Sequence, residues 1–144
     1  MFESLVEFRN YNPSKSFSSY SNEFKCEHLL FYFYDPKSEK HNRLKDECFS
    51  NRTIADYMNS NFICIAVVDQ FREAQELWTK LQPNKDYKEV LVNSFQLLNT
   101  TSGAYLGMFG QFNIDTLFPK LIDAKHKLSA STNDVASSAS TIIL

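Results

Sequence analysis

The stretch that decides the fold is His28-Leu29-Leu30-Phe31-Tyr32-Phe33-Tyr34-Asp35-Pro36-Lys37-Ser38-Glu39-Lys40-His41. Its first seven residues are nearly all apolar or aromatic, which is typical of a central strand that is covered on both faces. Asp35-Pro36 interrupts this run, and the charged segment from Lys37 to Glu47 then predicts a helix with one narrow apolar stripe. The stretch therefore predicts a buried strand that leads through a short loop into a helix.

Apolar spacing on either side of this stretch predicts the remaining elements. Phe17, Tyr20 and Phe24 recur at helical spacing, so we expect a helix within Ser14 to Glu27. Downstream, the pattern predicts a short helix capped by Asn51 or Thr53, a buried strand from Phe62 to Val68, a helix from Phe71 to Leu81, strands from Val90 to Leu98 and from Ala104 to Phe109, and a closing helix from Asn113 to about Leu128. The connection between the last two strands ends in glycine, which indicates a hairpin.

The order of these elements predicts a mixed sheet covered by helices, because parallel strands come early and a hairpin comes late. Pro119 lies inside the closing helix, where a missing backbone donor costs about 3 kcal/mol unless the proline is in the first turn. We therefore expect that helix to start near Thr116 or to kink there.

Composition divides the chain into three parts. Residues 1–13 precede the first predicted helix and are expected to be an N-terminal extension, and residues 14–128 form the domain. Residues 129–144 are rich in Ser, Thr, Ala and Asn, which bury too little apolar surface to offset the entropy of ordering. We expect them to be a flexible tail.

The bulk properties exclude several classes of function. The 144 residues are 43% hydrophobic and 15% aromatic, which suits one domain with one core. Fifteen Lys and Arg against 17 Asp and Glu give a formal charge of −2 with no basic run, so a nucleic-acid partner is not expected. No apolar stretch reaches the roughly 18 residues of a membrane span, and no secretory signal is visible. A cytoplasmic or nuclear location is expected.

The three cysteines, Cys26, Cys48 and Cys64, are scattered and form no CxxC pair. No two of the three histidines share a metal-ligand spacing, so neither a metal nor a cofactor is predicted. Reduced thiols in a reducing compartment fit this pattern best.

The predicted order of elements resembles the thioredoxin fold from about Phe17 to Leu128. The segment Cys48-Phe49-Ser50-Asn51-Arg52-Thr53-Ile54-Ala55-Asp56-Tyr57-Met58-Asn59-Ser60-Asn61-Phe62-Ile63 is similar to the UAS domains of ubiquitin-pathway adaptors. The resemblance implies a three-layer α/β sandwich with a central mixed four-stranded sheet flanked by helices. This sequence differs from the redox members of the fold in two ways. Ser38 and His41 stand where those members have cysteines, and no proline lies near Asn93 or Ser94. It also lacks the ubiquitin-like domain that UAS adaptors carry.

These departures favour a redox-inactive module that binds protein partners, with a role as an adaptor in ubiquitin-linked or protein quality-control pathways. The degenerate active-site corner, Ser38, His41, Asn93 and Ser94, is then the expected binding site. Ser38 and His41 could also form a hydroxyl and imidazole pair for nucleophilic catalysis. The sequence, however, indicates no group that would orient the imidazole and no oxyanion site. The simpler interpretation is a helix-capping serine and an exposed helical histidine.

Four alternatives remain open from the residues. A single-cysteine thiol oxidoreductase or transferase would use Cys48 or Cys26, although Cys48 lies four residues from Leu44 and so on the inward face of its helix. A fatty-acyl-chain binding domain would use the aromatic run from Phe31 to Tyr34, which is more typical of a core. Trp78 suits either an interface or packing on the sheet. The C-terminal Ile142-Ile143-Leu144 has the form that PDZ-type domains capture.

Overall fold

The computed structural model describes residues 2–68, 72–81, 94–107, 114–133 and 142–143. The predicted site residue Asn93 and most of the C-terminal tail lie outside the described residues. The elements in chain order are β1 (Arg9–Asn10), α1 (Phe17–Phe24), β2 (His28–Tyr34), α2 (Glu39–Glu47), α3 (Arg52–Asn61), β3 (Ile63–Val68), α4 (Arg72–Leu81), β4 (Ser94–Asn99), β5 (Tyr105–Gly107), a 3-10 turn η2 (Ile114–Thr116), α5 (Leu117–Asn133) and β6 (Ile142–Ile143).

The sheet is mixed, with the strand order β1-β3-β2-β4-β5-β6. The four expected strands form its centre: β2 is parallel to β3 and antiparallel to β4, and β4 and β5 form the predicted hairpin. The prediction of four strands is nevertheless wrong, because β1 is added beside β3 and β6 beside β5. Each added strand has only two residues, which is too short to leave a periodic pattern in the sequence.

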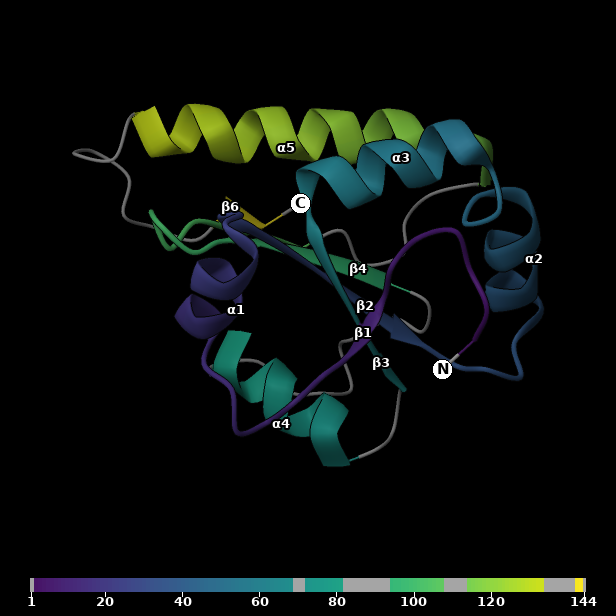
Figure 1. The fold of residues 1–144 in the computed structure, drawn as a ribbon, viewed down its shortest axis with the longest axis horizontal. Helices are drawn as coiled ribbons and strands as arrows, with labels where there is room; N and C mark the ends of the chain where they lie inside the picture. Colours follow the sequence, from purple (N-terminus) through teal and green to yellow (C-terminus); the bar gives the residue numbers. More distant parts are fainter. Residues whose placement is uncertain (1, 69–71, 82–93, 108–113, 134–141, 144) are drawn as a thin grey trace.

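Strand β2 is buried along its whole length, as its continuous apolar sequence predicts. Its alternate side chains divide between two cores. Leu30, Tyr32 and Tyr34 belong to the core that includes residues of α2, α3 and α5, whereas Leu29, Phe31 and Phe33 belong to the core that includes residues of α1 and α4. Figure 1 shows α3 and α5 along one side of the sheet and α1 and α4 along the other.

Local interactions fix where the helices begin and end. Ser38 caps α2, and the side chain of Asn51 caps α3 by accepting the backbone N–H of Ile54 at 3.1 Å. Helix α1 ends at Lys25, which has the left-handed φ of 53° that a helix C-cap often requires. Pro119 is the third residue of α5 and so lies in the first turn, where no amide donor is lost.

The N-terminal segment lies against the domain rather than apart from it. Val6 is buried in the core beside α2 and α3, and Tyr11 is buried in the core beside α1 and α4. We call residues 2–8 the N-terminal strap; in Figure 1 this segment runs beside α2 before it enters β1. Helix α5 extends to Asn133, past the predicted end near Leu128. The division into extension, domain and tail stays a prediction.

Candidate functional site

The candidate site is the corner where β2 leads into α2. Ser38 is the N-cap of α2, and its hydroxyl oxygen accepts the backbone N–H of His41 at 3.0 Å. The preceding turn is held by the Ser38 backbone N–H, which donates to the Asp35 carbonyl, and by the Lys37 backbone N–H, which donates to the Asp35 carboxylate. The interpretation of Ser38 as a capping serine is confirmed.

His41 is buried, with only 2% of its surface exposed, so the expectation of an exposed helical histidine is wrong. A hydrogen bond of 2.9 Å joins its Nδ1 to the hydroxyl of Tyr32. Its ring stacks on Tyr34 at 4.7 Å between centroids and meets the edge of Phe2 at the same distance. The side chain thus points into the aromatic core and not toward solvent.

His41 belongs to a group of rings that we call the aromatic cluster. Its members come from the strap, β2, α2, the turn after α2 and β4, and they are Phe2, Phe8, Tyr32, Tyr34, His41, Phe49 and Phe95. Phe49 meets Phe8 at 5.0 Å and Tyr32 at 5.4 Å, both edge to face. These geometries are the ones that aromatic pairs prefer.

Burial determines the protonation states of His41 and Tyr32. It lowers the pKa of His41, with Lys45 lowering it further and Asp35 opposing the shift. It also raises the pKa of Tyr32, so the tyrosine keeps its proton at neutral pH. A neutral imidazole bonded to a neutral phenol is a structural pair. Because the Ser38 oxygen accepts a backbone N–H while Nδ1 of His41 bonds Tyr32, the two groups have separate structural contacts.

The structure does not bring all the predicted site residues together. Ser94 pairs with Phe33 across β2 and β4, and directly paired residues project from the same face of a sheet. Phe33 belongs to the core beside α1 and α4, whereas His41 packs on Tyr32 and Tyr34, which belong to the other core. Ser94 is fully buried, and within the described residues its hydroxyl has no hydrogen-bond partner.

Cys48 and Cys64 are both buried, as the sequence predicts for core residues. Cys48 is the C-cap of α2, and burial with help from Glu47 and Asp115 raises the pKa of its thiol to about 11. Burial raises the pKa of Cys64 as well. Since the thiolate is the nucleophile, neither thiol is prepared for exchange at neutral pH.

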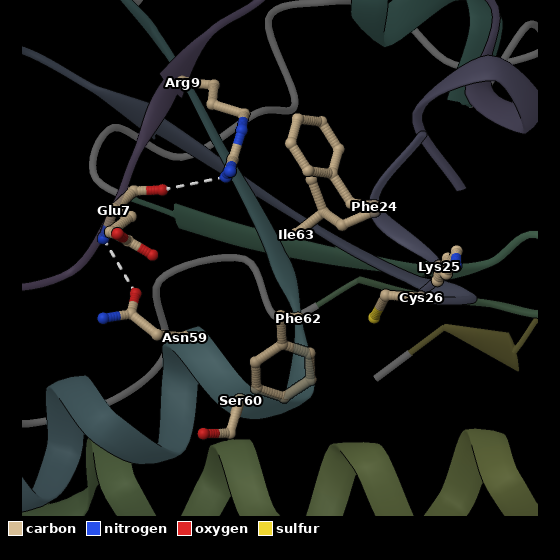
Figure 2. Close-up of a pocket in the computed structure, with 9 residues that line it drawn as sticks. All are labelled: Glu7, Arg9, Phe24, Lys25, Cys26, Asn59, Ser60, Phe62 and Ile63. Atoms are coloured by element: carbon tan, nitrogen blue, oxygen red, sulfur yellow. Dashed lines mark hydrogen bonds between the residues drawn. The ribbon is translucent and has the colours of Figure 1, made fainter. Parts of the chain in front are cut away.

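Cys26 differs from the other two because it is only half-buried and lines a cavity of about 210 Å³ at the opposite end of the sheet (Figure 2). The cavity lies between the end of α1, the start of β3 and the segment Glu7 to Arg9. The Cys26 thiol lies 3.5 Å from the Asn61 carbonyl oxygen and 3.6 Å from that of His28, as a weak donor. Above the cavity the Arg9 guanidinium lies 3.9 Å from the centre of the Phe24 ring.

Two further features of the sequence are explained by packing in the core. Trp78 is buried and meets Phe33 edge to face at 6.3 Å, so it packs on the sheet. The aromatic run Phe31 to Tyr34 is buried on both faces of β2. At the C-terminus, Ile142–Ile143 pairs with Leu106–Gly107 as an edge strand. Capture of the C-terminal tail by a PDZ-type domain stays a prediction.

Among the described residues, no three His, Cys, Asp or Glu side chains converge as metal ligands. None of the helices in the same part of the chain is both long and apolar enough to span a bilayer.

Comparison with protein-family models and with curated proteins finds no match to this chain. Among solved structures, the chain is similar to a thioredoxin from Thermus thermophilus, determined in solution, with a TM-score of 0.59 and 13% identity over 88% of each chain. The fold is thioredoxin-like. At this identity the likeness extends to the fold alone, and the narrower resemblance to UAS domains stays a prediction.

The thioredoxin-like corner contains residues that the sequence did not single out. The sequence pattern places Phe2 and Phe8 in an N-terminal extension and gives Phe49 no role of its own. Their contacts join segments that are distant in the sequence, so no local pattern indicates them. The one available signal was the high aromatic content, which is more than a single strand requires.

Proposed function

We propose that this chain is a redox-inactive thioredoxin-like module that binds protein partners. One observation carries the proposal: the two positions where thiols would act hold a serine that caps α2 and a histidine buried against Tyr32. The narrower form of the proposal is an adaptor in ubiquitin-linked or protein quality-control pathways, located in the cytoplasm or nucleus. It rests on the resemblance of the segment from Cys48 to Ile63 to UAS domains.

The chemistry of dithiol exchange supports the same proposal. Exchange needs one accessible thiolate that attacks and a second thiol that resolves the mixed disulfide. Cys48 is buried with its pKa raised to about 11, and Cys64 is buried in the sheet. Cys26 lines a cavity at the opposite end of β2 from Ser38. The described thiols therefore offer no attacking and resolving pair at the corner.

Insulin reduction tests the redox part of the proposal. In the presence of dithiothreitol, we expect the protein to precipitate insulin no faster than dithiothreitol alone. Thioredoxin-like turnover that is lost on Cys48→Ser or Cys26→Ser would contradict it.

Capture of partners from native extract tests the binding part. Lys37 is exposed in the loop before α2, and Lys37→Glu places an opposite charge at the corner. Arg72→Glu on α4 makes the same change in charge at another exposed site and serves as the matched control. We expect a specific partner to be lost with Lys37→Glu and kept with Arg72→Glu. Equal capture by both variants would place the binding surface elsewhere.

The alternative of a single-thiol oxidoreductase or transferase is favoured at Cys26 rather than at Cys48, since only Cys26 combines partial exposure with a cavity. Titration with a thiol reagent at pH 8 should modify Cys26 first, with Cys48 and Cys64 reacting only after denaturation. Three equally slow thiols would exclude this alternative.

The fatty-acyl-chain alternative has less support, because the aromatic residues of β2 fill the two cores. Calorimetry with unsaturated fatty acids should give neither heat nor stabilisation.

A further inference from the structure

Two different parts of the chain enclose the imidazole of His41. Tyr32 and Tyr34 belong to β2 and are buried within the sheet, whereas Phe2 belongs to the strap and is only half-buried. All three rings contact the imidazole, and the ring centroids of Phe2 and Tyr34 each lie 4.7 Å from that of His41. Of these three rings, Phe2 is therefore the outer one.

Ring contacts alone hold Phe2 in place. Among the described residues, neither Phe2 nor Glu3 makes a hydrogen bond. The first bonds from the strap to the rest of the domain come from the Ser4 hydroxyl and the Leu5 backbone N–H. Both donate to the Phe49 carbonyl, at 3.4 Å and 3.0 Å. The Phe2 ring can thus move without breaking a hydrogen bond.

The strap is held more firmly after Leu5. The side-chain amide of Asn59 on α3 donates to the Leu5 carbonyl at 2.9 Å, and its oxygen accepts the Glu7 backbone N–H at 2.8 Å, as Figure 2 shows for the second bond. Val6 is buried in the core. A movement of Phe2 therefore does not require the rest of the strap to open.

The surroundings of His41 disfavour a charged imidazole. Burial lowers its pKa, and Lys45, one turn further along α2, lowers it further, whereas Asp35 in the turn before α2 opposes the shift. Glu3 of the strap lines the same open hollow as Lys45. The groups that face the imidazole from β2 and from the strap are the uncharged rings of Tyr32, Tyr34 and Phe2.

We propose that protonation of His41 releases Phe2, so that the ring and the proton compete for the imidazole and the corner opens as the pH falls. A neutral imidazole is stable among rings, whereas an imidazolium that is removed from water is not. Because the sheet fixes Tyr32 and Tyr34, Phe2 is the ring that moves aside and admits water. The inference goes beyond the proposed function and stands whether or not the corner binds a partner.

The direction and size of the effect follow from proton linkage. With Phe2 in place the pKa of His41 is below 6.5, and it moves toward 6.5 when the ring leaves. The ratio of open to closed molecules should therefore rise as the pH falls from 6.5 to the lower value. For one proton, the rise is at most about tenfold per pH unit.

Nuclear magnetic resonance of the full chain tests the effect of the ring on the proton. The Cε1 proton of His41 is followed from pH 8 to pH 5. Phe2→Ala should raise the proton affinity of the imidazole at least about threefold, because the outer ring is removed. Leu5→Ala changes an exposed side chain of the same strap and is the matched control, which should leave the midpoint where it is. Equal midpoints in the unchanged and Phe2→Ala chains would overturn the proposal.

The effect of the proton on the ring is measured on the unchanged chain, so the proposal stays testable if Phe2→Ala fails to fold. Nuclear Overhauser contacts between Phe2 and Tyr34 should weaken with the midpoint of His41, while those between Phe8 and Phe49 persist. In His41→Gln the Phe2 contacts should persist over the whole range.

Three outcomes of this measurement would overturn the proposal. His41 could titrate while Phe2 keeps its contacts at full strength, which would show that the ring and the proton do not compete. Simultaneous loss of both sets of contacts would mean global unfolding. Release of Phe2 at the same pH in His41→Gln would assign the proton to another group.

Discussion

Each end of β2 has a buried histidine nearby, and the surroundings of the two histidines differ. At one end His41 is enclosed by rings of the aromatic cluster, with Phe2 of the strap over it. At the other end His28 lies 3.4 Å from the side-chain nitrogen of Asn99 and at the edge of Phe62, and the cavity lined by Cys26 opens beside it. The end that holds Ser38 and His41 is filled by rings, and the end that holds the half-buried Cys26 has an open cavity.

The largest expected difference between the two ends is in packing. Phe49→Ala should lower the free energy of unfolding by about 3–5 kcal/mol, because the ring is fully buried in the aromatic cluster and its loss leaves a cavity. Phe24→Ala at the open end is the matched control and should cost about 1 kcal/mol or less, since Phe24 is 37% exposed. Urea denaturation measures both. Similar losses would remove the distinction between the ends.

The pH dependence of stability should report both histidines. Burial lowers the pKa of His28 and of His41 in the folded chain below the ordinary 6.5. The unfolded chain therefore binds more protons between 6.5 and the lower folded value, so stability is full above 6.5 and falls as the pH drops through this window. The slope can reach about 1.4 kcal/mol per pH unit for each histidine.

Replacing His41 by Gln should reduce this slope, and His28→Gln should reduce it as well. Unfolding curves between pH 5 and pH 8 provide the measurement. A slope that survives both buried replacements would mean that other groups carry it.

The helix cap at the filled end should have a smaller effect. Ser38→Ala removes the acceptor for the backbone N–H of His41 and should cost about 1 kcal/mol. Ser38→Asp keeps an acceptor at the N-terminus of α2 and should retain most of the stability. If the two variants are equally destabilised, capping is not what Ser38 contributes.

The smallest effect is expected at the open end. Arg9→Gln removes the cation above the Phe24 ring, which at an exposed site is worth about 0.5–1 kcal/mol. The shift in urea midpoint should be small and should vanish in a Phe24→Leu background. A loss as large as that of Phe49→Ala would show that this end is also a packed core.

The sequence predicts the strands best where apolar residues run without a break. β2 matches its predicted bounds and β3 differs from its own by one residue, because strands buried on both faces carry a continuous apolar signal. The two-residue strands β1 and β6 carry no such signal. The function of Ser38 as a cap could be predicted as well, since capping depends on residues only three apart.

The rest of the site depends on contacts between distant segments. The burial of His41 needs Phe2 from the strap and Tyr34 from β2, and no local pattern in α2 indicates them. Whether Ser94 shares a face with His41 depends on the register between β2 and β4, which is set by the whole sheet.

The contacts of Asn59 have an evolutionary consequence. Its side-chain amide donates to the Leu5 carbonyl and its oxygen accepts the Glu7 backbone N–H, so these bonds do not depend on which side chains stand at positions 5 and 7. Selection on the strap should then act on Phe2, Val6 and Phe8 and leave positions 3, 5 and 7 to drift. In related chains that keep this strap, we expect apolar residues to be retained at positions 2, 6 and 8, together with an asparagine or glutamine near the end of α3.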